Sequence, residues 1–395
     1  MSGADATPTP ALPQGGGSSP GLPRLEALVA EAQRVLAICN ACRYCEGYCA
    51  VFPALERRLA FDEHDVHYLA NLCHNCGACL YACQFAPPHE WQVNFPRLMA
   101  QVRKETYRKY VWPTSLGRAF EHNGTVVALL LAACLAGFIG FTAAYASPDR
   151  FFSAWSDAQG AFYAVLPHGL MARLFAAVFA FVVLAFAMSW LSFWPASGEE
   201  PIAFVQPVTL SAATSDAGSL RYLDGGGDGC TWPTAKPSFA RRHAHHMTFY
   251  GFVLCFASTT VATIYHYVFG WPAPYPLYSL PVMLGTLGGV GLVVGPLGLL
   301  ALRSRRDPDL ADRSQDGMDR AFIVLLLVVA ATGLALLGLR ETRAMGVALA
   351  LHLGSVLAFF LAMPYGKFVH GLYRFAALVR FHIERRRPLP DVASE

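Results

Sequence analysis

Charged residues are scarce in this sequence. Asp, Glu, Lys and Arg make up 14% of its 395 residues, whereas hydrophobic residues make up 54%. A soluble protein of this length needs a more polar surface, so we expect membrane spans. The net charge is only +3, and no basic run is interleaved with aromatic residues. We therefore expect no nucleic-acid partner.

Other absences exclude several kinds of function. The GGGDG at 225–229 is not framed by a strand and a helix, so it is not a dinucleotide fingerprint. We find no acid–base constellation and expect no catalytic residue. Residues 1–23 are rich in Pro, Gly, Ser and Ala and lack the apolar core of a signal peptide, which predicts a disordered tail.

Eight of the eleven cysteines stand in two runs with the same spacing, C-x2-C-x2-C-x3-C. Three thiolates spaced in this way wrap one face of a [4Fe–4S] cluster, and the fourth thiolate reaches the other cluster in two-cluster ferredoxins. Zinc ribbons use pairs of CxxC instead, and disulfides would need an oxidising compartment. The spacing assigns cluster I to Cys39, Cys42, Cys45 and Cys83, and cluster II to Cys73, Cys76, Cys79 and Cys49.

Around these cysteines the sequence lacks strand-like alternation, which favours an α-helical ferredoxin domain. After it, a basic amphipathic helix over 91–110 is expected to lie along the membrane surface. Six apolar segments of about 20 residues follow, each long enough to cross a bilayer. We therefore predict an all-α protein with a two-cluster domain at 24–112, a six-span membrane domain at 113–375 and a basic tail at 376–395. The spans are expected near 125–145, 170–193, 247–270, 281–302, 320–340 and 346–365, with a long loop at 195–246.

The basic residues outside the spans predict the orientation. They gather between spans four and five, before span three and after span six, whereas the loop WPAPYPLYSLP between spans three and four is uncharged. The positive-inside rule then puts both termini and the clusters in the cytoplasm, with the chain in the inner membrane. Within the long loop, Gly225 to Gly227 fit a hairpin turn, and Cys230 is expected to be structural.

Histidines within or beside two spans suggest haem ligands, because a histidine in a membrane usually pairs or ligates. His266 and His352 stand near the outer ends of spans three and six, so together they are candidates for an outer haem b. On the cytoplasmic side, His370 is expected to pair with His245 or His246 around an inner haem b. His352 and His370 are 18 residues apart, roughly 27 Å along one continuous helix, so one helix would present them to two different haems. The sequence leaves open whether one or two haems are bound.

The stretch LHLGSVLAFFLAMPYGKFVHGLYR at 351–374 resembles the last span of the gamma subunit of respiratory nitrate reductases. YHYVFG at 265–270 is similar to the helix end that carries the outer-haem ligand in that subunit. The resemblance implies that His266 and His352 ligate the outer haem and that His370 is an inner ligand. Phe256 occupies the family's other inner-ligand position, so His245 or His246 must substitute there, or the inner haem is absent.

The whole layout, with RYLDGGGDGC and ARRHAHH in the loop, resembles the tricarballylate (citrate) utilisation protein B family over about residues 30–385. This resemblance implies an electron-transfer subunit rather than a complete enzyme. Electrons would come from a cytoplasmic FAD-dependent dehydrogenase and reach the membrane quinone through the clusters and haem.

Three alternatives remain. A related arrangement is fused to a flavoprotein of cobalamin (precorrin-3B) synthesis. Heterodisulfide-reductase-like enzymes also have paired cluster motifs, but they need adjacent Cys-Cys motifs, and only Cys134, Cys230 and Cys255 remain here. A redox sensor would need an output domain, which we do not find.

Overall fold

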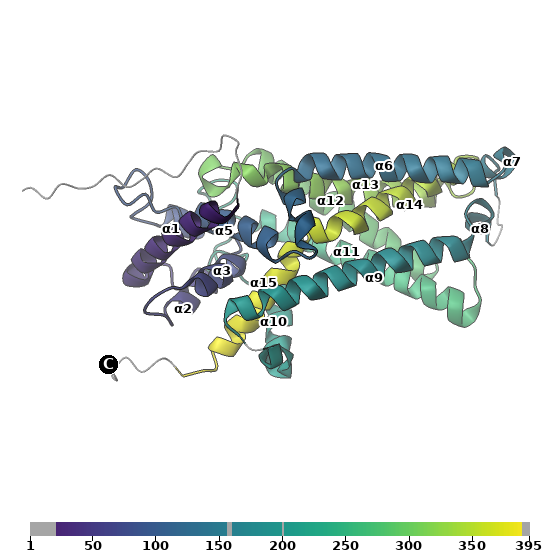
Figure 1. Ribbon diagram of the computed structural model, residues 1–395. Helices are drawn as coiled ribbons and strands as arrows, with labels where there is room; N and C mark the ends of the chain where they lie inside the picture. The colour runs from purple at the N-terminus through teal and green to yellow at the C-terminus, as the bar shows by residue number, and fades with distance from the viewer. Residues whose placement is uncertain (1–20, 156–159, 200, 389–395) are drawn as a thin grey trace, which may run out of the picture.

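The computed structural model describes residues 21–155, 160–199 and 201–388, and within these ranges the chain is helical (Figure 1). The described part contains no strand, only an isolated bridge between Cys230 and Ser238. The predicted all-α fold is therefore confirmed. The predicted hairpin around Gly225 to Gly227 is wrong, because no strands flank this turn.

The N-terminal domain consists of α1 (Gly21–Cys42), α2 (Val51–Leu55), α3 (Glu63–Leu72), α4 (Ala78–Tyr81) and α5 (Phe95–Tyr110). Most of the tail predicted at 1–23 lies outside the described residues, and α1 already begins at Gly21. Polar caps set two of the other helix starts. The Asp62 side chain accepts a hydrogen bond from the Asp65 amide at 2.8 Å, and Asn94 accepts one from the Arg97 amide at 3.2 Å.

Helix α5 packs inside the N-terminal domain, contrary to the position along a membrane surface predicted for 91–110. Its apolar face packs in the core of the N-terminal domain, where Met99, Val102 and Tyr107 are fully buried. Even Arg103 and Lys104 are buried, and they bond to backbone carbonyls of other segments. An amphipathic pattern gives the apolar face of a helix but not what covers it.

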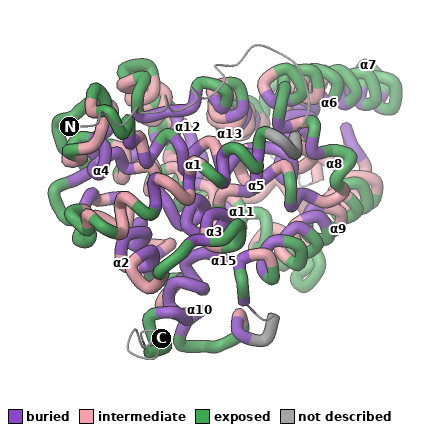
Figure 2. Tube along the Cα trace, turned by 60° about the vertical axis from the view of Figure 1, so that its left-hand side comes forward, coloured by how far each residue is buried: buried purple, intermediate pink, exposed green. Residues whose placement is uncertain are grey.

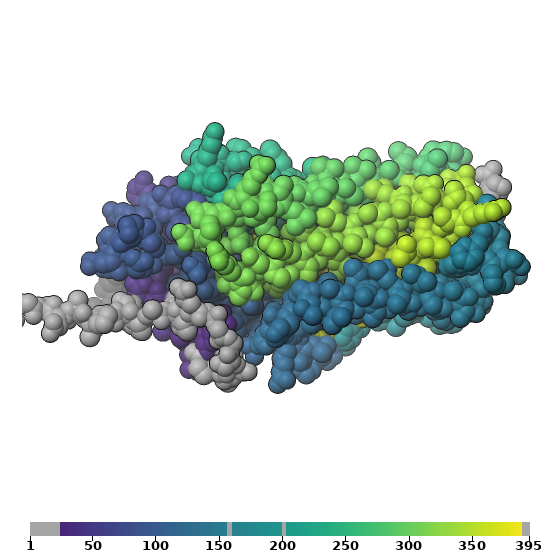
Figure 3. All heavy atoms as spheres, turned by 90° about the horizontal axis from the view of Figure 1, so that it is seen from above, coloured from purple at the N-terminus to yellow at the C-terminus, as the bar shows by residue number. Residues whose placement is uncertain are grey.

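Six helices in the described part are long and apolar enough to cross a membrane. They run side by side away from the N-terminal domain (Figures 1 and 3). Their outward surfaces are largely exposed, whereas α3 and α15 are mostly buried (Figure 2). The spans are α6 (Asn123–Tyr145), α9 (His168–Phe193), α11 (Ala240–Phe269), α12 (Leu280–Ser304), α13 (Asp316–Leu339) and α14 (Met345–Ala362).

Short helices fill the connections between the spans. At the end of the bundle distant from the N-terminal domain lie α7 and α8 (Figure 1). The connecting helices are α7 (Pro148–Phe151), α8 (Ala161–Val165), α10 (Pro207–Ser219) and the 3-10 turns η1 (Thr114–Phe120), η2 (Pro195–Ser197), η3 (Pro201–Val205), η4 (Pro308–Leu310), η5 (Arg313–Gln315) and η6 (Met363–Tyr365).

Helices α11 and α12 approach each other closely through glycines. A Cβ on Gly288 would lie 2.8 Å from the backbone nitrogen of Cys255, and one on Gly251 would lie 2.9 Å from the Gly288 carbonyl oxygen. Larger residues would separate the two backbones. On a neighbouring face of α11, Phe252 contacts Phe359 of α14 and Phe368, which directly precedes α15.

The chain after the last span forms another helix, α15 (Val369–Glu384). A proline cannot continue the hydrogen bonds of a helix, and α14 ends two residues before Pro364. His352 and His370 therefore lie on different helices, not on the continuous one expected from the sequence. The predicted tail at 376–395 is helical as far as Glu384, and its final residues, 389–395, lie outside the described residues.

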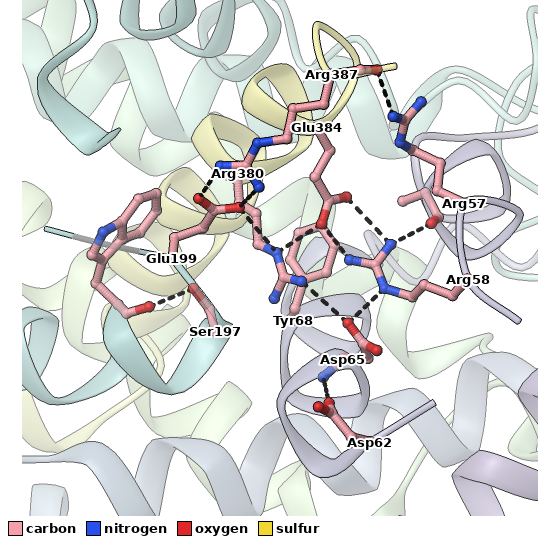
Figure 4. Close-up of polar contacts among 12 residues, drawn as sticks. Arg57, Arg58, Asp62, Asp65, Tyr68, Ser197, Glu199, Arg380, Glu384 and Arg387 are labelled. Atoms are coloured by element: carbon pink, nitrogen blue, oxygen red, sulfur yellow. Dashed lines mark hydrogen bonds and ion pairs between the residues drawn. The ribbon is translucent and has the colours of Figure 1, made fainter. Parts of the chain in front are cut away.

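Helix α15 joins the two parts of the molecule. It packs in the same hydrophobic core as α1, α3 and α5, and Tyr373 stacks on Tyr107 with ring centroids 5.5 Å apart. Beside this core, Glu384 binds the guanidinium groups of Arg58 and Arg380 (Figure 4). Arg380 also bonds to Asp65 of α3 at 3.1 Å. The N-terminal domain is thus held on α15 by apolar packing and by a nearly buried ion network.

Candidate electron-transfer site

The structure brings Cys39, Cys42, Cys45 and Cys83 together; we call these four thiols set I. They line one cavity of about 290 Å³ at the surface of the N-terminal domain. Cys39 lies in the last turn of α1, whereas Cys83 follows α4, so the fold delivers the fourth thiol from the other cysteine run. Tyr44 beside this cavity is 70% exposed. Set I therefore lies close to solvent.

The remaining thiols, Cys49, Cys73, Cys76 and Cys79, form set II. Their proximity shows in the pKa of Cys49, which is raised well above its usual value by burial and then by Cys76 and Cys73. Cys73, Cys76 and Cys79 are buried. This grouping is the one expected from the sequence, in which the last cysteine of each run belongs to the set formed by the other run.

Both sets offer four thiols to a group that prefers thiolates, and set I also surrounds a space larger than a single ion needs. In the described chain, no three His, Cys, Asp or Glu side chains converge closely enough to hold a single metal ion; the thiols of set I surround a space instead. Burial raises the pKa of Cys45 to about 12, with Cys83 and Cys42 contributing. Burial likewise raises the pKa of Cys76 to about 12. Such thiols stay protonated until a cationic metal centre deprotonates them. All eleven cysteines are free thiols.

The long loop before α11 covers set II. A Cβ on Gly77, which has φ of +88°, would lie 2.6 Å from the Thr231 carbonyl oxygen, and one on Gly226 would lie 3.0 Å from that of Gly47. Cys230 is fully buried in the cluster of apolar residues that contains Cys76. Its thiol donates to the Leu223 carbonyl at 3.3 Å. This part of the loop packs on the N-terminal domain, and Cys230 has the structural position expected of it.

Three arginines bind the backbone of set II. Arg103 donates to the Cys73 carbonyl at 2.6 Å, and Arg374 donates to the same carbonyl at 3.0 Å. Arg241 donates to the Asn75 carbonyl at 2.6 Å and to that of His74 at 3.4 Å. These arginines come from α5, α15 and α11. Set II is therefore fastened directly to the helices that bear the inner histidines.

The inner histidines face each other at the same end of the bundle. The rings of His245 and His370 have centroids 6.2 Å apart and an angle of 77° between their planes. His370 donates through Nδ1 to the Lys367 carbonyl at 2.5 Å, which leaves Nε2 with a free lone pair. An iron between two imidazoles, each bound at about 2.0 Å, places their centroids roughly 6 Å apart. The centroid separation of His245 and His370 is therefore close to that of two imidazoles bound to one iron.

His246 lies elsewhere. Its ring is next to Tyr250, with centroids 5.8 Å apart. No ring contact with His370 is found among the described residues. Of the two alternatives left open by the sequence, the structure brings His245 to His370.

At the outer end, His266 and His352 are not brought together as the sequence suggested. His266 stacks on His168, with centroids 3.7 Å apart, and Tyr163 lies at 5.6 Å. The Nδ1 atom of His352 lies 3.2 Å from the Thr332 hydroxyl, and its ring fills the space left by Gly333. Stacked imidazoles are too close for an iron between them, so the outer arrangement does not fit a haem as it stands.

Sequence reasoning missed several of these residues. His168 lies at the start of the second span. Its position directly before an apolar segment was the sequence feature that could have indicated a further histidine at the outer end of the bundle. Arg103 belongs to the basic helix expected at 91–110, and Arg241 and Arg374 belong to the basic residues that predict the orientation; the sequence indicated no contact with the cysteines for any of them. The pKa of His74 and the pKa of His370 are both well below the usual histidine value. The main cause for each is burial, and the second is the positive charge of Arg374. Arg374 thus lies between set II and the inner histidines.

These features define a class: an all-helical membrane protein with an N-terminal ferredoxin-type domain. The sequence family described as citrate utilization protein B matches residues 123–391, and the Fer4-like domain of that protein matches residues 32–109. A citrate utilization protein B from Escherichia coli is 49% identical over 363 residues, which cover 91% of this chain and 93% of the relative. No solved structure matches. The chain belongs to the citrate utilization protein B family, and its Fer4-like domain supports iron–sulfur binding and an electron-transfer role.

Proposed function

We propose that this protein passes electrons from a cytoplasmic FAD-dependent dehydrogenase of the tricarballylate or citrate type to the membrane quinone. Set I and set II hold two [4Fe–4S] clusters, and His245 with His370 hold haem b. Bound clusters and haem supply single-electron chemistry, which the side chains of this chain lack. The relative's name, which refers to citrate utilization, supports the choice of dehydrogenase.

The observation that carries this proposal is the position of set II. Three of its four cysteines are buried at the junction of the two domains, and Arg374 connects the Cys73 carbonyl to the helix of His370. An electron carrier needs its redox groups close together and shielded from solvent at the point of transfer. Set I, near the surface, remains accessible to a partner protein.

The distribution of charge supports inner-membrane insertion with both termini in the cytoplasm. The basic loop between α12 and α13 contacts the N-terminal domain, where Tyr81 donates to Asp307 at 2.6 Å and Asn94 donates to the Asp309 carbonyl at 2.8 Å. The cysteine domain and the basic loop thus share one side, which by the positive-inside rule is cytoplasmic.

A dithionite-reduced minus oxidised visible spectrum tests the proposal. The detergent-purified protein, produced with iron and a haem precursor supplied, is expected to show sharp b-type bands over a broad iron–sulfur bleach. Non-haem iron and sulfide should match two [4Fe–4S] clusters. A spectrum without the bleach would overturn the electron-transfer proposal. A bleach without haem bands would remove the role given to His245 and His370.

A further inference from the structure

Three arginines at set II have no carboxylate partner in the part of the chain that the structure describes. Arg103, Arg241 and Arg374 instead donate to backbone carbonyls of 70–75. Arg241 also lies over the Trp232 ring, 4.4 Å from its centroid. A partly or fully buried positive charge is costly unless something negative lies near it. Four thiolates around a [4Fe–4S] centre supply that negative charge.

Arg241 and Arg374 each lie one helical turn from an inner histidine, on the same helix. Arg241 precedes His245 by four residues on α11, and Arg374 follows His370 by four residues on α15. Four residues are about one helical turn, roughly 6 Å along the axis. Each arginine therefore reaches from the turn beside a predicted ligand to the backbone of Cys73–Asn75.

Set I has no such arrangement. Its cavity is lined by apolar residues, by Gln84 and by the four cysteines themselves, without a lysine or arginine among the lining residues. The cluster-binding spacing is the same in the two runs, so the two sets differ in their burial and in these arginines.

We propose that Arg241 and Arg374 are positioning residues that hold set II against the inner histidine pair and raise the reduction potential of cluster II above that of cluster I. This inference rests on the function proposed above. A nearby positive charge favours the reduced cluster, because reduction adds one negative charge. With the clusters and haem bound, the two electrons of the reduced dehydrogenase flavin would pass one at a time through set I, set II and the His245–His370 pair. Quinone would take up both, with two protons, to form quinol.

The test is an EPR-monitored redox titration of the intact, detergent-purified protein. The signals of the two clusters are assigned by their loss in Cys42→Ser and Cys76→Ser. In Arg374→Gln and in Arg241→Gln, the equilibrium constant for reducing cluster II should fall about tenfold, or ~59 mV for one electron. Cluster I should not shift. Arg374→Lys and Arg241→Lys keep the charge and should recover most of the potential.

Arg242→Gln is the matched control. Arg242 is adjacent to Arg241 but donates to the Ser219 carbonyl at 2.8 Å and faces Asp224, so its replacement should leave both potentials unchanged. An unchanged cluster II potential in both Gln variants, with normal iron content, would overturn the inference. So would an equal shift of both clusters. If Arg374→Gln does not fold, the cluster II potentials of Arg241→Gln and Arg241→Lys test the inference.

The titration also separates this inference from the proposed function. If the wild-type protein holds both clusters and haem but the Gln variants titrate like wild type, only the role of the arginines fails. If the wild-type protein holds no clusters, the proposed function fails, and the inference fails with it.

Discussion

Set I and set II have the same sequence spacing but lie in different surroundings. Set I lines an open cavity beside Tyr44, which is 70% exposed. Set II is buried beneath the loop that contains Cys230, and three arginines bind its backbone. Spacing alone predicts what the thiols bind. Their surroundings suggest that one set receives electrons and the other delivers them to the membrane domain.

The largest effect is expected from removing a thiol of set II. Cys76→Ser should reduce electron transfer from the dehydrogenase to quinone by more than about 100-fold, since a hydroxyl is a poor replacement for an iron-bound thiolate. Membrane insertion should be retained. Stopped-flow spectroscopy with the reduced dehydrogenase would measure this.

The matched variants are Cys42→Ser in set I and Cys134→Ser in α6. Cys42→Ser should block reduction by the dehydrogenase but still allow dithionite to reduce the haem. Cys134→Ser should behave like wild type, because this cysteine belongs to neither set. Normal quinone reduction by Cys76→Ser would contradict the assignment of set II.

Iron removal should distinguish the two sets next. With a chelator and a mild oxidant, about half of the non-haem iron should leave in a fast phase, because set I is closer to solvent. The slow phase should come from set II. Iron release followed by absorbance, with Cys42→Ser as a variant without the fast phase, measures this. A single phase in the wild type would show that the difference in burial does not control access.

The ion network on α15 should matter more for set II than for set I. Glu384 binds Arg58 and Arg380 close to Tyr68 on α3, the helix that leads into Cys73 (Figure 4). Glu384→Ala leaves two guanidinium groups short of a partner, so we expect a loss of about 3 kcal/mol in unfolding free energy. Chemical denaturation followed by cluster absorbance measures it.

The control for this variant is Glu31→Ala, which breaks the Arg34–Glu31 pair within α1. An i,i+3 pair that is partly exposed contributes less than about 1 kcal/mol. Equal losses in the two variants would mean that the network does not hold the domains together.

The smallest effect concerns pH. Burial first, and then the charge of Lys109, lowers the pKa of His67 in α3 from 6.5 to about 4. The unfolded chain takes up this proton at higher pH than the folded one. The stabilisation is therefore complete above pH 6.5 and is lost progressively as pH falls toward 4. His67→Gln should flatten the stability profile between these values in denaturant titrations. An unchanged slope would contradict the assignment.

Much of the architecture follows from the sequence. The cysteine spacing predicts both sets of four, including the exchange of Cys49 and Cys83. The apolar segments predict the six spans, and most of the predicted span ends lie within a few residues of the observed helix ends. Both features depend on local patterns. The break after α14 was also present as Pro364, although the histidine spacing was interpreted as if the helix continued.

The partners of the amphipathic and basic elements could not be predicted in this way. An apolar stripe on α5 fits a membrane surface as well as a protein core, and the basic end of the chain fits a tail as well as a buried helix. His245 and His246 are adjacent in sequence, so only their directions on α11 distinguish them.

The sequence by itself thus determined the two sets of four cysteines, the number of apolar spans and the class of the protein, because these depend on residue type at short, fixed intervals. Only the tertiary structure decided that set II lies at the domain junction, that His245 faces His370 and that His266 stacks on His168. It also decided that Arg103, Arg241 and Arg374 converge on Cys73–Asn75. These contacts join segments far apart in the chain, and their geometry depends on how helices pack rather than on any local pattern.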